Sequence, residues 1–483
     1  MKRGLFLSGF VLWVVCGQAV ADPLVLTAAD IGRLAARNSL DVQLALYSQR
    51  IAATAEGQAR SVLDAYLLAD AGYRSNDSRR LSSSGALDNR DHEYSLGAQK
   101  KLSSGTSLDL GVSANRLWSD LNGLNHEQVY GLTVVQDLGR NFFGRADRAG
   151  IALAEVETAL AELGALRQVE LKIAEVIAAY WQWVFSLEQR AVEGALEVQA
   201  ARLHAVQKEK LRSGLAETGD VAAAQAHHVS SSSDLALARH TADSNEQVLK
   251  YLLNLDHNAP AMSPAEALFP DSFEASEVQL LKKAFRERRD YLSALRAVQA
   301  RDLALVVARD GMLPVVNLKA SLLRNGLGED FPEAADDGAA NSNDDFFVGF
   351  SVKVPLQNSA ARSRSERARL EKATALLQLK QAERRIILEV HDQIRACRVY
   401  FEAARAEAEV ADLQAKKLAE EEKKFARGRS SIDTIIRYQQ DLLAARLKKA
   451  QSALRFRLAQ VELELKEGAI LPTYWRGASG EKL

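Results

Sequence analysis

Two long stretches of this chain contain no proline, from Leu24 to Ala259 and from Leu356 to Leu471. Proline inside a helix costs about 3 kcal/mol, so very long helices exclude it. The second stretch carries an apolar seam with alternating steps of three and four residues, the heptad pattern of helices packed side by side. A helix of about 65 residues would be about 100 Å long, far longer than helices of globular domains.

The heptad seam of the second stretch consists of Ile387, Val390, Ile394, Cys397, Phe401, Ala404, Ala408, Ala411, Ala415 and Leu418. A similar stripe in the first stretch consists of Leu153, Val156, Leu160 and Leu163, continued by Ile173, Ile177, Tyr180, Val184 and Leu187. The many alanines let helix axes approach closely. Because Cys397 lies on the seam, we interpret it as a small buried apolar residue rather than a reactive thiol.

Residues 1–21 have the pattern of a secretory signal peptide. Lys2 and Arg3 precede an apolar run from Leu5 to Val15, and Ala19-Val20-Ala21 supplies small residues for cleavage after Ala21. The run is too short to span a membrane as a helix, and an uncleaved anchor helix is the less favoured alternative. The sequence therefore predicts an exported protein.

Cleavage would remove Cys16 and leave Cys397 as the only thiol, so an internal disulfide is excluded. Lipidation at Cys16 is not expected, because Trp13-Val14-Val15 lacks the small residue wanted just before the cysteine. No later segment has eighteen consecutive apolar residues, so helical membrane spans are excluded. An exported protein can still cross a membrane as a closed β-barrel.

Two regions change from helical periodicity to strict alternation of apolar with polar or small residues, the pattern of strands between lipid and water. The expected strands are Ala65–Arg74, Glu93–Leu102, Thr106–Trp118 and Gln128–Leu138 in the first region, and residues 316–322 and 346–354 in the second. Ser103-Ser104-Gly105 predicts a tight turn. Residues 75–91 and 325–345 are expected to be long exposed loops.

The chain repeats itself once. Lys210-Leu211-Arg212-Ser213-Gly214 matches Lys424-Phe425-Ala426-Arg427-Gly428 at an offset of 214 residues. We therefore expect residues 22–254 to form a first repeat with strands at about 65–138, and residues 286–471 a second repeat with strands at about 314–355. Residues 255–285 form a connector between the repeats, and residues 472–483 a C-terminal tail. Each repeat runs from helix to strands to long helix, glycine turn and long helix.

The sequence shows no convincing constellation of catalytic residues, so we do not expect an enzyme. Lys and Arg number 62 against 63 Asp and Glu, without the basic stripe that a nucleic-acid binder needs. No phosphate-binding loop motif occurs, and no cofactor is expected. His227 and His228 are adjacent and cannot share a helix face, so we interpret them as helix-surface residues and not as a metal site.

One such chain has too few strands to close a barrel, and a barrel leaves no free edge in lipid. Several copies must therefore share one barrel. The predicted fold class is mainly α with membrane β, a two-fold internal repeat of long helices and β-hairpins.

Four stretches then point to a known family. They are Val135-Gln136-Asp137-Leu138-Gly139, Leu313-Pro314, the turn from Gly214 to Val221, and Phe425-Ala426-Arg427-Gly428 with the following helix and Gly468. By their order, duplication and spacing the chain resembles the TolC-like outer-membrane efflux proteins, or outer membrane factors, across essentially the whole mature sequence.

The resemblance implies a homotrimer in the outer membrane of a Gram-negative bacterium, in contact with its lipid. Its strands would form one shared β-barrel, continuous with an α-helical barrel that extends into the periplasm, and the connector at residues 255–285 would lie in an equatorial region around the middle of the helical barrel. Such channels dock on a periplasmic adaptor and an inner-membrane pump of the RND or ABC type, and export drugs, metals or proteins. The family supplies four strands per protomer, whereas this chain has six. The extra hairpin could enlarge the barrel or fold over its mouth.

The resemblance places a gate and an adaptor-docking tip at the two glycine turns, at Gly214 with Leu215 and at Gly428. Asp220 matches the family's Asp in this motif, and a trimer would carry an acidic ring that attracts cations. The other candidate gate residues are Asp433, Arg429, Arg437 and Tyr438. Asp220 and Asp433 could instead only cap helices.

The alternative function is a secreted trimeric coiled coil with a structural or adhesive role. The heptad seam alone permits it. The alternating strands argue against it, because they lie between the helices of each repeat rather than at one end of the chain.

Overall fold

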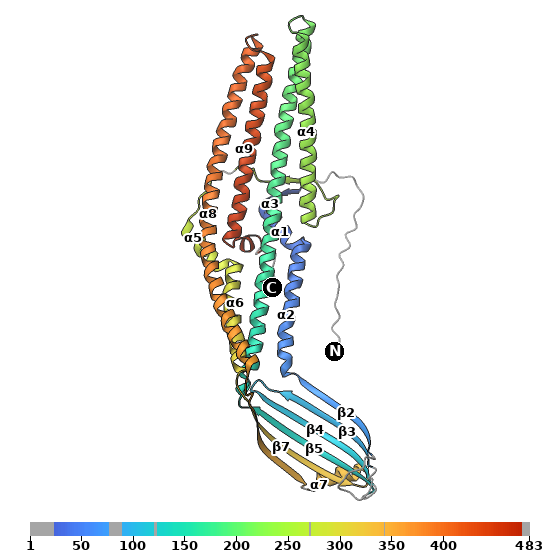
Figure 1. Ribbon diagram of the computed structural model, residues 1–483. Helices are drawn as coiled ribbons and strands as arrows, with labels where there is room; N and C mark the ends of the chain where they lie inside the picture. Colours follow the sequence, from blue (N-terminus) through green and yellow to red (C-terminus); the bar gives the residue numbers. More distant parts are fainter. Residues whose placement is uncertain (1–23, 77–88, 120–122, 270–271, 342, 476–483) are drawn as a thin grey trace.

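The computed structural model describes residues 24–76, 89–119, 123–269, 272–341 and 343–475. The molecule is elongated, with long helices at one end and a single curved sheet at the other (Figure 1). The expected signal peptide with Cys16, most of the expected loop at 75–91 and the last eight residues of the tail lie outside the described residues.

Two long helical hairpins extend away from the sheet (Figure 1). The first pairs α3 (Arg145–Arg212) with α4 (Thr218–Leu252), and the second pairs α8 (Ser359–Ala426) with α9 (Ile432–Lys466). Both α3 and α8 have 68 residues, so each is about 100 Å long at 1.5 Å per residue. The long helices predicted from the absence of proline are confirmed.

The heptad seam of α8 is confirmed with one correction. Val390, Ile394, Cys397 and the alanines that follow are buried or half-buried, but the side chain of Ile387 is 48% exposed and Ile386 is buried instead. A straight helix has 3.6 residues per turn, so a strict three-four alternation drifts off the buried face over several turns. Burial raises the pKa of the Cys397 thiol to about 12, as expected for an unreactive core cysteine.

Shorter helices complete the bundle. These are α1 (Ala28–Asn38), α2 (Leu40–Arg60), α5 (Glu277–Glu287) and α6 (Arg289–Asp310). The halves of α3 and α8 nearest the sheet pack against α2 and α6. The main core lies where α1, α3 and α9 meet a π-helical turn at Leu471–Trp475, and Tyr180 and Trp183 are its largest fully buried side chains. A parallel pair of short strands, β1 (Leu24–Leu26) and β6 (Met262–Pro264), joins the connector to the start of the described chain.

The sheet has six strands in the order β2-β3-β4-β5-β7-β8, and every neighbouring pair is antiparallel. The strands are β2 (Ala65–Asn76), β3 (Asn89–Lys101), β4 (Thr106–Ser119), β5 (Gly123–Asp137), β7 (Val315–Gly328) and β8 (Asp344–Lys353). All six expected strands are present. The extra hairpin, which brings the number of strands from the family's four to six, is a continuous part of the sheet and does not fold away from it.

The prediction of a long exposed loop at residues 325–345 is wrong. Strand β7 continues to Gly328, and helix α7 (Phe331–Ala340) follows before β8 begins at Asp344. Asp330 caps α7 by accepting a hydrogen bond from the backbone N–H of Glu333, and Pro332 occupies the first turn, where no N–H is needed. The glycine and acidic residues that suggested a loop therefore form a short helix fixed to the sheet.

Candidate functional site

The six-stranded sheet has two chemically different faces. Because partners in register share a face, the pairing assigns each strand residue to one side. The apolar face carries Leu67, Ala69, Leu96, Ala98, Leu108, Leu110, Val112, Leu132, Val134, Leu318, Ala320, Leu322, Phe346, Val348, Phe350 and Val352. The other face is mostly polar or small and carries Asp70, Ser95, Gly97, Gln99, Asp109, Gly111, Ser113, Thr133, Asn317, Lys319, Ser321, Ser351 and Lys353, with Tyr66, Leu68, Val129, Val135, Leu323 and Phe347 among them; we call it the polar face.

The polar face is hollowed across three neighbouring strands. Gly97, Gly111 and Gly131 lie in one row, and the hollow above them has a volume of about 320 Å³. Without side chains in this row, the backbone itself forms the wall. A wall with one apolar face and one polar, small-residue face suits a boundary between lipid and a water-filled passage.

Helix α7 lies on the apolar face, over the far ends of β5 and β7. Imidazole Nδ1 of His126 lies 2.8 Å from the carbonyl oxygen of Glu329, and the amide of Gln128 donates to the carbonyl of Phe331. A Cβ atom on Gly326 would lie 2.1 Å from the carbonyl oxygen of Ala334, so only glycine lets α7 approach this closely. The polar face is therefore free of α7.

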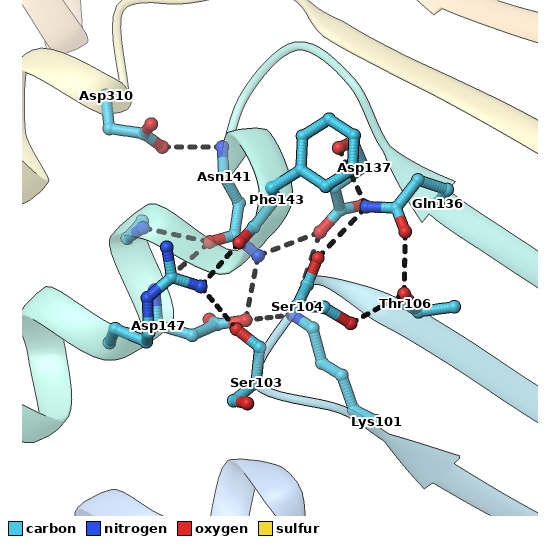
Figure 2. A network of polar contacts seen from close by, with 12 residues as sticks. Lys101, Ser103, Ser104, Thr106, Gln136, Asp137, Asn141, Phe143, Asp147 and Asp310 are labelled. Carbon is cyan, nitrogen blue, oxygen red and sulfur yellow. Dashed lines mark hydrogen bonds and ion pairs between the residues drawn. The ribbon is translucent and has the colours of Figure 1, made fainter.

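A polar network fastens the sheet to the start of α3 (Figure 2). The Lys101 ammonium lies 2.7 Å from the carboxylate of Asp147, and the amide of Asn141 donates to both Asp137 and Asp147. The backbone N–H of Asn141 donates to the carboxylate of Asp310 at the end of α6, at 2.7 Å. Strands β3 and β5 and helices α3 and α6 are thus held at one point.

The junction also contains unusual backbone. Asn141 and Phe143 have φ angles of 59° and 47°, and Gly105 and Gly144 have 71° and 74°. A Cβ atom on Gly144 would lie 2.1 Å from the carbonyl oxygen of Ser103, so both the angle and the space require glycine. The predicted turn at Ser103-Ser104-Gly105 therefore packs directly against the first turn of α3.

The far ends of both helical hairpins are glycine turns of the same construction. Gly214 and Gly428 both have a φ of 70°, and the next backbone N–H donates to the carbonyl of Lys210 in the first turn and of Lys424 in the second. This is the usual end of a helix at a left-handed glycine. Leu215 is 77% exposed beside the first turn. The turns that join α3 to α4 and α8 to α9, which contain Gly214, Leu215 and Gly428, lie at the end of the molecule farthest from the sheet (Figure 1).

The candidate gate residues do not form one cluster within the chain. Asp220 accepts a hydrogen bond from the backbone N–H of Glu217, so it takes part in a capping box at the start of α4. Asp433 lies exposed in the first turn of α9, whose cap is Ser431. Tyr438 is contacted by the ammonium of Lys417, 3.8 Å from the ring centroid, and by Arg437 at 5.5 Å.

Contacts between the two hairpins were missed by the sequence analysis. Lys210 lies over the ring of Phe425, 4.5 Å from its centroid, and so links the two tips. His227 is buried against α9 with its Nε2 atom 3.2 Å from Oε1 of Gln439, so the interpretation of this residue as helix surface is wrong. Burial lowers its pKa. A helix packed on two sides buries polar positions that its own sequence does not mark.

A buried ionic network lies between α3, α6 and α8. The carboxylate of Glu170 is fully buried, with Arg167 and Arg289 at 3.5 Å and 3.6 Å, too long for strong hydrogen bonds. Burial raises the pKa of Glu170 to about 7. Nearby, the guanidinium of Arg288 donates to Asp290 and Glu389. Arg167 and Glu170 have the i, i+3 spacing of helix partners, but nothing in the sequence marks Arg289 as a partner of Glu170 or Glu389 as a partner of Arg288.

Among the described residues, no group of three or more His, Cys, Asp or Glu side chains could hold a metal ion. Within the same part of the chain, no helix combines the length and the hydropathy that crossing a membrane requires.

Solved structures with this architecture are outer-membrane channels. The CmeC outer membrane channel of Campylobacter jejuni superposes with a TM-score of 0.70 at 15% identity, over 92% of this chain and 85% of that chain. The open MtrE outer membrane channel of Neisseria gonorrhoeae gives 0.66 at 16% identity, over 92% and 89%. The chain has the fold of outer-membrane channel proteins.

The outer membrane protein VceC of Vibrio cholerae also superposes, with a TM-score of 0.68 at 16% identity over 91% of this chain and 96% of that chain. No protein-family model and no curated protein matches the sequence. The resemblance predicted from the sequence is thus confirmed for the fold.

Proposed function

We propose that this chain is the outer-membrane channel subunit of a tripartite efflux or type I secretion system, and that it works as a homotrimer. The observation that carries the proposal is the sheet, apolar on one face and polar on the other, joined directly to helices of 68 residues. Such a sheet fits a barrel wall in the outer membrane of a Gram-negative bacterium, and helices of about 100 Å fit a periplasmic duct.

Two unpaired edge strands and an exposed apolar stripe on a helix support association of several copies. Strands β2 and β8 are the two edges of the sheet and expose unpaired backbone groups, which lipid does not tolerate. Helix α2 exposes an apolar stripe at helical spacing, consisting of Leu40, Leu44, Tyr47 and Ile51. A second copy would cover both features.

The two-fold internal repeat is supported by the helix lengths. Helices α3 and α8 have 68 residues each, α4 and α9 have 35 each, and both pairs are offset by 214 residues. Three copies of a repeated unit would thus supply equivalent hairpins around a ring.

The proposed mechanism is passage through a gated, water-filled conduit and involves no chemical reaction. The polar faces line a water-filled passage through the membrane, and the ring of helical hairpins continues it to a gate at the tips. A periplasmic adaptor would dock at Gly214, Leu215 and Gly428, and an inner-membrane pump of the RND or ABC type would supply the energy. Asp220, Asp433, Arg429, Arg437 and Tyr438 would line or hold the gate. A secreted coiled coil has no use for the apolar face of the sheet, which argues against that alternative.

Single-channel recording tests the proposal. Protein purified in detergent is added to a planar bilayer, and its cross-linked mass is measured on the same sample. We expect discrete, mostly closed, cation-preferring events from a trimer. A protein that is soluble without detergent and gives no channels would overturn the proposal.

Two neighbouring residues of β8 provide matched variants. Phe350 lies on the apolar face and Ser351 on the polar face. A lysine near the middle of a lipid-facing strand costs about 2–4 kcal/mol, whereas a lysine facing water is tolerated. Phe350→Lys should therefore lower the amount of channel in the outer membrane, while Ser351→Lys should assemble normally. Equal assembly of both variants would contradict the assignment of the faces.

A further inference from the structure

The apolar face continues without a break through the strands that exceed the family pattern. On β3 and β4 it shows Leu96, Leu110 and Val112, which are 55%, 60% and 40% exposed. Their neighbours Ser95, Gly111 and Ser113 lie on the polar face. A hairpin folded over a channel mouth would meet water on both sides and would gain nothing from this alternation. The pattern fits strands with lipid on one side.

The stagger of the six strands is that of an ordinary barrel. The row perpendicular to the strands that starts at Ala65, the first residue of β2, passes through Lys100, Leu108, Val134 and Ala320 and ends at Val348. Val348 lies five positions before Lys353, the end of β8 nearest the helices. From each strand to the next, the perpendicular row thus shifts by about one residue relative to the strand ends. An eight-stranded barrel of shear 8 has the same shift of one residue per strand, and its strands are tilted by about 36°.

The edges are compatible with pairing between copies. Strand β2 runs away from the helices and β8 runs back toward them. A β8 edge placed beside the β2 edge of another copy would therefore continue the antiparallel order. With six strands per copy, a ring of any number of copies closes without a parallel pair.

The width of the sheet matches the width of the helices above it. Four helices connect to the strands in each copy: α2, α3, α6 and α8. Helices about 9 Å apart give an arc of about 36 Å for four. Strands 4.8 Å apart and tilted about 36° take about 5.9 Å each around a ring, so six strands also give about 36 Å, while four give only about 24 Å.

We infer that the extra strands belong to the wall and that three copies close one barrel of eighteen strands, with β8 of each copy paired to β2 of the next. This inference rests on the proposed trimeric channel. Such a barrel has a backbone diameter of about 34 Å and, after about 5 Å of side chain on each side, a lumen of about 24 Å. Twelve strands at the same tilt leave about 13 Å, little more than one helix with its side chains.

The wide lumen defines the class of cargo that the sheet end can pass. Helix α7 lies on the apolar face and leaves the lumen open. The hollow on the polar face combines three glycines with the small side chains of Ser95, Ser113 and Thr133, beside larger ones such as Leu68 and Leu323. The sheet end therefore admits polypeptide segments with two helices side by side, and selection by size falls to the helical tips.

Polymer exclusion measures this lumen. Neutral polyethylene glycols of graded size are added to each side of the planar bilayer in turn, and the conductance of single open channels is recorded. Eighteen strands predict that polymers of about 18 Å diameter enter from the sheet side and lower the conductance, whereas twelve strands at the same tilt exclude them. A trimeric channel that excludes these polymers from both sides would overturn the inference and leave the proposed function intact.

Cysteine labelling tests the wall independently. In membranes, a charged maleimide should label Ser95→Cys in the lumen and spare Leu96→Cys in lipid, until detergent exposes both. Ser113→Cys and Val112→Cys form the same matched pair on β4. Background labelling of the native thiol should be low, because Cys397 is buried. Equal labelling within each pair in a conducting trimer would show that the hairpin lies outside the wall, whereas absence of any channel would instead refute the proposed function.

Discussion

The ammonium of Lys101, at the end of β3, lies 2.7 Å from the carboxylate of Asp147, in the first turn of α3. This ion pair joins the sheet to the start of α3 (Figure 2). Lys101 and Asp147 are 28% and 16% exposed, so water screens the pair only in part. The pair therefore helps to fix the position of α3 relative to the sheet.

Lys101→Met should destabilise the junction. The substitution keeps the aliphatic chain but leaves Asp147 without its cation, which costs about 1–3 kcal/mol at a partly buried site. Thermal unfolding of the purified protein should therefore occur at a lower temperature. Lys100→Met is the control, because Lys100 is exposed on the opposite face. Equal unfolding temperatures for the two variants would show that the pair contributes nothing.

Glu170 should make stability fall as the pH rises. Its pKa is about 7 in the native chain and 4.5 as an ordinary glutamate. Below pH 4.5 both states hold the proton. Between pH 4.5 and 7 the unfolded state loses the proton first, so the free energy of unfolding declines by about 3 kcal/mol. Glu170→Gln should therefore unfold at a higher temperature than the unmodified chain at pH 8 and at the same temperature near pH 4.5.

The control for Glu170 is Glu175→Gln on the same helix, whose side chain is 52% exposed. It should leave the pH dependence unchanged. A Glu170→Gln variant with the original pH dependence would mean that another group titrates.

The tips should open when contacts of Asp433 or Arg429 are removed. Among the described residues, neither side chain has an ion pair within the chain, so their partners in the trimer would belong to neighbouring copies. Asp433→Ala and Arg429→Ala should raise single-channel conductance or the fraction of time open. Glu407→Ala, which removes an ion pair with Lys448 of the same chain, is the control. Unchanged conductance in both tip variants would refute the gate.

Gly326→Ala should release α7 from the sheet. The added methyl group would lie 2.1 Å from the carbonyl oxygen of Ala334 and 2.3 Å from the backbone nitrogen of Gly338, so the helix must move. Cleavage at Glu333 by a glutamate-specific protease should become several-fold faster, with channel conductance preserved. Gly72→Ala, where the methyl group meets open space, should cleave as before. Unchanged cleavage of Gly326→Ala would show that α7 tolerates the methyl group.

The sequence by itself determined the elements that depend on near neighbours. Heptad spacing and the absence of proline determined the long helices, alternation determined all six strands, and Gly214 and Gly428 marked the turns. Each of these patterns repeats within a few residues, so the sequence shows it directly. The resemblance of fold followed from their order.

The tertiary structure alone decided which distant residues meet. It placed the extra hairpin in the sheet, seated α7 on Gly326, buried His227 against Gln439 and paired Lys101 with Asp147. Residue 227 and its partner are 212 positions apart, and no local periodicity encodes such a contact. Burial and pairing of this kind depend on how whole helices and strands pack, which the sequence of one segment does not specify.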